Sequence, residues 1–143
     1  MFNRPMEMFA LDILVAILKI EDTSSRYKNV EDLLYSYNDW DSVIREFEII
    51  GEASKHLIKS KILTKKHQKI VDFRNKISHE YFGIEAAEIW NVIHKNLSEF
   101  KASVEDIINI TEIDLKEELI HSFIEDNRYL DFIVQYLEKI NQD

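Results

Sequence analysis

The chain of 143 residues is long enough for one domain with a sizeable hydrophobic core, and it carries a formal net charge of −9. Two glycines and one proline are too few for the turns of a β-sandwich or the phosphate loops of a doubly wound sheet, so the composition predicts an all-α fold. The absence of cysteine excludes disulfides, zinc–thiolate sites and thiol nucleophiles, and it fits the cytoplasm, where we expect the protein to act.

Apolar residues recur at helical spacing from the beginning of the chain. A first helix is predicted at 6–22; it is too polar for a signal peptide and too short to span a bilayer, so we expect no membrane association. A polar connection (23–29) and a short helix or turn (30–35) follow. The next helix should begin at Asn38 or Asp39, where Asn38 and Asp41 resemble a capping box, and its buried face should hold Val43, Phe47, Ile50, Ser54 and Leu57. Gly51 within it costs about 1 kcal/mol relative to alanine, which predicts the close approach of another backbone.

Four further helices are predicted in the second half of the chain. One spans 65–82, with Thr64 as its cap, Gly83 as its stop, and Ile70, Phe73, Ile77 and Tyr81 on one face. Another spans 85–109, with a stripe of Ala86, Ile89, Ile93, Leu97, Phe100 and Val104. Thr111 and Asp114 give a capping signal for a helix at 112–125, and the last helix is expected at 127–141. The pattern predicts an antiparallel bundle of four to six helices forming a single domain over residues 1–143.

Charge is distributed unevenly along this acidic chain. Residues 54–79 carry eight Lys and Arg against one Asp, a net charge of +7, whereas residues 104–143 carry three basic and eleven acidic residues, a net charge of −8. A basic patch on an acidic protein suits a polyanion such as RNA. Candidate phosphate contacts are Lys65, Lys66, Lys69 and Lys76. The alternative is a lysine-rich helix end that is merely solvated.

Within the basic segment, Arg74 is followed after four residues by His79, and Tyr81 lies two residues further on. Five residues of α-helix turn 500°, so Arg74 and His79 would lie about 140° apart. Such a pair suits metal-free RNA cleavage: an imidazole can take the 2′-hydroxyl proton, an imidazolium can protonate the leaving 5′-oxygen, and a guanidinium can hold the phosphate. Because one histidine does not suit both proton transfers, a two-fold dimer is favoured. From spacing alone, a capping or core histidine is the alternative.

Two longer sequence motifs resemble those of a known protein family. Residues 43–55 (VIREFEIIGEASK) resemble the AVIRNLEIIGEAAK signature of the HepT-like family of the HEPN superfamily, and residues 74–84 (RNKISHEYFGI) resemble its RNKLIHEYFGI block. Residues 90–93 resemble the helix that follows, so the resemblance covers roughly residues 6–102. It implies a HEPN-type antiparallel helical bundle and a two-fold homodimer in which the Arg-x4-His motifs of two protomers meet in a cleft. Residues from about 104 to 143 would then be a C-terminal helical extension.

The resemblance also implies a function. Characterised HepT-like proteins are ribonuclease toxins of toxin–antitoxin systems, encoded with a nucleotidyltransferase antitoxin, MntA, that transfers AMP from ATP onto the tyrosine of the His-x-Tyr motif. By this resemblance Arg74 and His79 are catalytic, Tyr81 is the site of AMPylation, and Asn75 and Glu52 are supporting groups. No metal or cofactor is implied, apart from the ATP that the antitoxin uses as AMP donor. The implied partners are a second copy of the chain, an MntA-like antitoxin and an RNA substrate.

Other interpretations remain open at this stage. A non-catalytic helical partner or substrate-binding subunit of a nucleotidyltransferase would share the fold, although the retention of the Arg-x4-His-x-Tyr motif favours the nuclease. A di-iron bundle needs two Glu-x-x-His words, and only Glu118–His121 has that spacing. The acidic segment 104–143 is expected to add helices with solvated acidic faces. The alternatives are that it covers a groove, binds the partner or mimics RNA on the basic patch.

Overall fold

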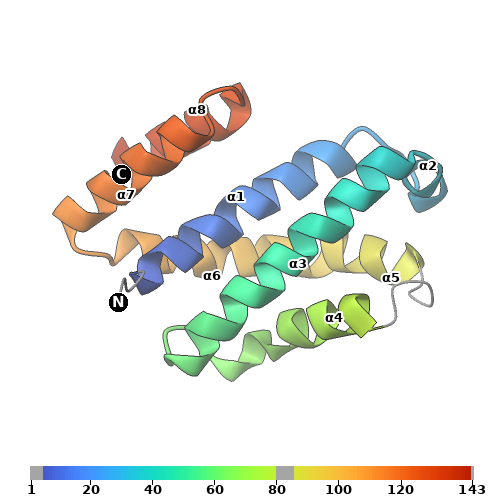
Figure 1. Ribbon diagram of the computed structural model, residues 1–143, viewed down its shortest axis with the longest axis horizontal. Coiled ribbons are helices and arrows are strands. Elements are labelled where there is room, and N and C mark those ends of the chain that lie inside the picture. The colour runs from blue at the N-terminus through green and yellow to red at the C-terminus, as the bar shows by residue number, and fades with distance from the viewer. Residues whose placement is uncertain (1–4, 80–85, 143) are drawn as a thin grey trace.

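The structure is a computed structural model that describes residues 5–79 and 86–142, with the side chains of Ser78 and His79 left out. Figure 1 shows a bundle of helices, and no strand occurs among the described residues. In chain order the elements are α1 (Met6–Ser24), α2 (Val30–Tyr35), α3 (Tyr37–Lys59), the 3-10 turn η1 (Lys65–His67), α4 (Gln68–His79), α5 (Ala86–Asn91), the π-helical turn η3 (Val92–Asn96), α6 (Leu97–Asn109), α7 (Ile113–Asp126) and α8 (Asp131–Gln142). The all-α prediction is confirmed.

Helix α1 is the centre of the bundle. It packs along α3 on one side and α6 on the other, and Figure 1 shows α3 running antiparallel beside it. Every residue from Ala10 to Leu18 except Asp12 is buried, as expected of a helix enclosed on several sides. No helix among the described residues is both long and apolar enough to cross a membrane.

Most positions of the predicted inward faces are buried where the structure describes them, although Ala86 is only half-buried. On α3, all five positions expected to face inward are buried: Val43, Phe47, Ile50, Ser54 and Leu57. On α4 the buried set includes Ile70, Phe73 and Ile77, and the rings of Phe47 and Phe73 meet edge to face with centroids 5.1 Å apart. Tyr81 and Gly83, predicted at the end of this helix, lie outside the described residues.

Two of the three predicted helix caps are wrong, and the third is only partly right. Helix α3 begins at Tyr37 after Ser36, which makes no side-chain capping bond, so no capping box forms at Asn38. Thr64 does stand at the start of η1, but its hydroxyl makes no capping bond. Helix α7 is capped by Glu112, whose carboxylate accepts from two backbone N–H groups, rather than by Thr111, whose hydroxyl donates to a carbonyl of the preceding turn. Polar residues one or two positions apart compete for each cap, and local geometry decides between them.

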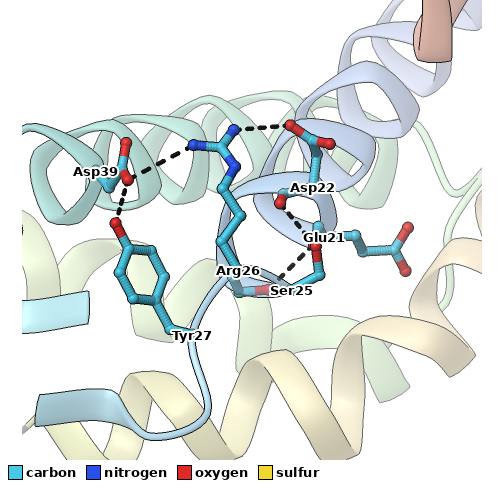
Figure 2. A network of polar contacts seen from close by, with 7 residues as sticks. Glu21, Asp22, Ser25, Arg26, Tyr27 and Asp39 are labelled. Atoms are coloured by element: carbon cyan, nitrogen blue, oxygen red, sulfur yellow. Dashed lines mark hydrogen bonds and ion pairs between the residues drawn. The ribbon is translucent and has the colours of Figure 1, made fainter. Parts of the chain in front are cut away.

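A network of polar side chains, rather than a capping box, connects the end of α1 to the first turn of α3. Figure 2 shows Arg26 between two carboxylates, with its guanidinium nitrogens 2.9 Å from Asp22 at the end of α1 and 3.6 Å from Asp39 in the first turn of α3. The hydroxyl of Tyr27 also donates to Asp39. A negative side chain is favourable in the first turn of a helix, so this network orders the predicted polar connection and sets where α3 starts.

The single helix predicted at 85–109 is interrupted within the described residues. Helices α5 and α6 are joined by η3, a five-residue π-helical turn. His94 in this turn donates from Nδ1 to the carbonyl oxygen of Trp90, 2.9 Å away, and its ring lies 4.3 Å from the indole. The His94 side chain thereby gives a hydrogen-bond partner to a carbonyl in the last turn of α5, just before the irregular turn.

The acidic C-terminal segment forms the antiparallel pair α7–α8. The hydroxyl of Tyr136 on α8 donates to Glu105 on α6, and Lys101 lies over the Tyr136 ring, 4.7 Å from its centroid, while bonding Glu21 of α1 at 2.8 Å. Burial and this carboxylate raise the pKa of Tyr136 above its ordinary value, so the phenol stays a donor. Figure 1 places the pair on the side of α1 away from α4, so within one chain these helices extend the bundle rather than cover the basic segment. The last helix begins at Asp131, four residues later than predicted.

Candidate functional site

Arg74 packs against the single glycine in the middle of α3. A Cβ atom built on Gly51 would lie 2.0 Å from the Cβ and 2.3 Å from the Cγ of Arg74. Carbon atoms normally meet at about 3.5–4.0 Å, so no side chain fits at position 51 while Arg74 keeps its place. The sequence predicted the close approach of another backbone at Gly51, and the atoms that approach it are instead those of the side-chain stem of Arg74, the candidate catalytic arginine on α4.

The guanidinium of Arg74 is held by an acid and an amide. Its Nη2 lies 3.3 Å from Oε2 of Glu52, and its Nη1 donates to Oδ1 of Asn75 at 3.3 Å. Its Nε is buried and has no hydrogen-bond partner among the described residues. The Arg74 side chain is 30% exposed and that of Glu52 is 51% exposed, so the outer nitrogens face solvent while the stem is fixed. The structure thus brings together three of the candidate site residues.

His56 adds to this cluster and was not among the site residues predicted from the sequence. Its Nε2 lies 3.9 Å from the other carboxylate oxygen of Glu52, and its ring stacks on Phe9 of α1 with centroids 4.5 Å apart. Glu52 therefore lies between an arginine and a histidine. The signal was present, because Glu52 and His56 are i,i+4 neighbours on a predicted helix.

His79 is the last residue of α4, so Arg74 and His79 are carried by one continuous helix, as predicted. The His79 side chain and the whole of Tyr81 lie outside the described residues, and their placement stays a prediction. The two-fold dimer that would bring two such motifs together also stays a prediction.

The four candidate RNA-binding lysines do not share one environment. Lys66 lies 3.7 Å from Glu99, and Lys76 bonds both carboxylate oxygens of Glu88 at 2.8–2.9 Å. Lys65 and Lys69 form no salt bridge with any described residue. The net charge of +7 on residues 54–79 is therefore partly balanced by carboxylates of α5 and α6. The sequence alone does not reveal this pairing.

His67 is the last residue of η1 and is buried. Its Nε2 lies 3.1 Å from the hydroxyl of Ser103 on α6, and its ring contacts Phe100 with centroids 4.9 Å apart. Burial, and secondly the nearby charge of Lys66, lower the pKa of His67, while Glu99 opposes the change. His67 is therefore a neutral residue that ties η1 to α6. Among the described residues, no group of three or more His, Asp and Glu side chains is arranged to hold a metal ion.

Comparison with known proteins connects this arrangement to a family. The family described as "Ribonuclease HepT-like" matches residues 13–107, which include Gly51, Glu52 and the whole Arg74–Tyr81 motif. The chain is 40% identical over 70 residues to "Putative RNase TTE0752" of Caldanaerobacter subterraneus, an alignment covering 46% of this chain and 61% of that protein. It is 34% identical over 67 residues to "Putative RNase MJ1380" of Methanocaldococcus jannaschii, covering 45% and 62% of the two chains.

A third relative aligns over more of its length. "Probable ribonuclease HepT" of Thermococcus cleftensis is 32% identical over 101 residues, which cover 67% of this chain and 89% of that protein. The aligned part of this chain thus spans somewhat less than two thirds of the first two relatives and most of the third. No solved structure matches the chain. The family match over 13–107, together with this relative, shows that the chain belongs to the ribonuclease HepT-like family.

Proposed function

We propose that the protein is an endoribonuclease that cleaves RNA without a metal ion and serves as the toxin of a toxin–antitoxin system. The observation that carries the proposal is the seating of Arg74 on Gly51 beside Glu52, in a chain of the ribonuclease HepT-like family. An arginine whose stem is packed and whose outer nitrogens face solvent is preorganised to bind a phosphate. The names of the relatives, all described as ribonucleases, support the same reaction class.

In the proposed reaction His79 acts on the ribose and Arg74 on the phosphate. Neutral His79 removes the proton of the 2′-hydroxyl, whose oxygen attacks the adjacent phosphorus. The bond from phosphorus to the 5′-oxygen breaks, and the protonated His79 of the second protomer gives its proton to that oxygen. Arg74 stabilises the charge that builds up on the phosphate oxygens. The products are a 2′,3′-cyclic phosphate and a free 5′-hydroxyl, so no water is consumed in this step.

Glu52 has a supporting role in this proposal. At 3.3 Å it orients the guanidinium of Arg74 in the absence of RNA, and a phosphate would compete with it for the outer nitrogens. Asn75 occupies the other side of the guanidinium. Both residues therefore position Arg74 and touch neither the attacking nor the leaving oxygen.

The regulation proposed for this toxin is covalent. A nucleotidyltransferase antitoxin of the MntA kind would transfer AMP from ATP to the hydroxyl of Tyr81, with release of pyrophosphate. Tyr81 follows His79 by two residues, so each AMP places a negative phosphate and a bulky base near the reacting groups. Electrostatic repulsion of RNA and steric block would both inhibit cleavage.

The test of the proposed function is digestion of total RNA by the purified protein in EDTA. The wild type should cleave, and Arg74→Ala and His79→Ala should each abolish cleavage while keeping the wild-type melting curve. Lys95→Ala, an exposed lysine on η3, is the matched control and should cleave normally. If the folded wild type leaves RNA intact, the protein is instead a non-catalytic partner of a nucleotidyltransferase.

A further inference from the structure

A groove lies between α4 and the helix formed by α5, η3 and α6. Its volume is about 470 Å³, within the range of about 300–1,000 Å³ typical of small-molecule sites. It opens on a different face of α4 from Arg74: Lys76 lines the groove, and two residues of helix separate it from Arg74 by about 160° around the axis. The groove is thus separate from the cluster of Arg74, Glu52 and Asn75, and it takes in three of the four candidate RNA-binding lysines, Lys66, Lys69 and Lys76.

The floor of the groove is aromatic and uncharged. Phe73, Phe100 and His67 form it together with Ile70, and all four are buried. His67 is fixed by its hydrogen bond to Ser103 and by its contact with Phe100, and its lowered pKa keeps the imidazole neutral. Such a floor suits a flat, uncharged ring, because base–aromatic stacking contributes about 1–3 kcal/mol per base.

The wall of the groove carries amides and the rim carries lysines. Asn91 and Asn96 lie on the α5–η3 side, where each amide can both donate to and accept from the edge of a base. Asn96 ends the π-helical turn, an irregularity that often occurs at functional sites. On the α4 side stand Lys66, Lys69 and Lys76.

The charges of the rim indicate how large an anion fits. Glu99 pairs with Lys66 and Glu88 with Lys76, and both pairs are exposed and therefore weak. Lys69 lies between these lysines in sequence, is exposed, and forms no salt bridge with a described residue. With Asp72 included, three lysines face three carboxylates, so the rim carries no net charge and Lys69 is left as the cation for one phosphate group.

We propose that this groove binds one nucleotide, with the base on the aromatic floor, the asparagines at its edge and the phosphate at Lys69. The nucleotide is either a free mononucleotide or one residue of an RNA strand, and the second case rests on the proposed ribonuclease function. In that case the groove holds the strand at a distance from the bond that is cleaved.

The test is an NMR titration with two probes, AMP and a 2′-O-methylated RNA hexamer that cannot be cleaved. Either probe should shift the resonances of His67, Phe100 and the side-chain amides of Asn91 and Asn96. Lys69→Glu should weaken binding at least tenfold. Lys95→Glu makes the same charge change on η3 outside the groove, and it should bind as the wild type does.

The outcomes distinguish the two sources of the nucleotide. Shifts with AMP alone indicate a free mononucleotide, and shifts with the hexamer alone indicate a residue of RNA; both support the site. No shift in the groove with either probe, or equal weakening by Lys95→Glu, overturns it. Cleavage of unmodified RNA by the wild type, measured in parallel, separates failure of this inference from failure of the proposed function.

Discussion

Replacing Gly51 with alanine tests the packing on which the site depends. In an open helix this change should stabilise the protein by about 1 kcal/mol, since alanine is the better helix former. Here the new Cβ would lie 2.0 Å from the Cβ of Arg74, about 1.5 Å inside normal contact, and that atom is fixed to the backbone of α4. Overpacking of this kind costs about 1–3 kcal/mol, so we expect a net destabilisation of up to about 2 kcal/mol.

Urea denaturation at fixed protein concentration measures this effect. A double-mutant cycle with Arg74→Gly isolates it, because removing the Cβ of residue 74 makes room for the new methyl group. In the Arg74→Gly background Gly51→Ala should therefore be neutral or stabilising. RNA cleavage by Gly51→Ala should also fall, since Arg74 must move away from Glu52. A single Gly51→Ala variant that is more stable than the wild type would refute the packing argument.

Three further predictions concern charge and regulation. RNA affinity should fall steeply with salt, and Lys65→Glu combined with Lys66→Glu should flatten the slope of log affinity against log salt; an unchanged slope would mean that these lysines are only solvated. Burial raises the pKa of Glu46 in the folded protein, despite the opposing charges of Lys19 and Arg45. The stability that Glu46 contributes is therefore fully present below the pKa that it has in the unfolded chain, and it is lost as the pH rises through its pKa in the folded protein. Glu46→Gln should therefore melt like the wild type near pH 4 and at a higher temperature at pH 8, and equal melting at both pH values would contradict this. Tyr81→Phe should keep its cleavage activity and escape the antitoxin, and intact-mass analysis after co-expression with the antitoxin should show AMP on the wild type only.

The inward faces of the helices could be predicted because burial follows helical periodicity. Ile50 and Ile77 are fully buried where the pattern placed them. Helix ends were less predictable, because neighbouring polar residues compete for the same cap, as Thr111 and Glu112 do. The π-helical turn left no signal in the apolar stripe, which continues through Ile93 and Leu97.

Residues of the site could be predicted only where they lie in short sequence motifs. Gly51, Glu52, Arg74 and Asn75 were identified from two segments, and the structure joins these segments. The salt bridge between Lys76 and Glu88 was not foreseeable, since it depends on how two helices pack. The groove beneath Lys69 was missed for the same reason, because its floor and wall come from residues up to about thirty positions apart in sequence.

We infer that RNA is cleaved by attack of its own 2′-hydroxyl, with His79 transferring the protons and Arg74 stabilising the charge on the phosphate. Mass spectrometry of the ends produced in EDTA tests it most directly, using an oligonucleotide in which the ribose at the cleaved position is either unmodified or 2′-deoxy. We expect a 2′,3′-cyclic phosphate and a 5′-hydroxyl from the unmodified substrate, no cleavage at the 2′-deoxy position, and no product with His79→Ala. A 5′-phosphate product, or cleavage at the 2′-deoxy position, would contradict it.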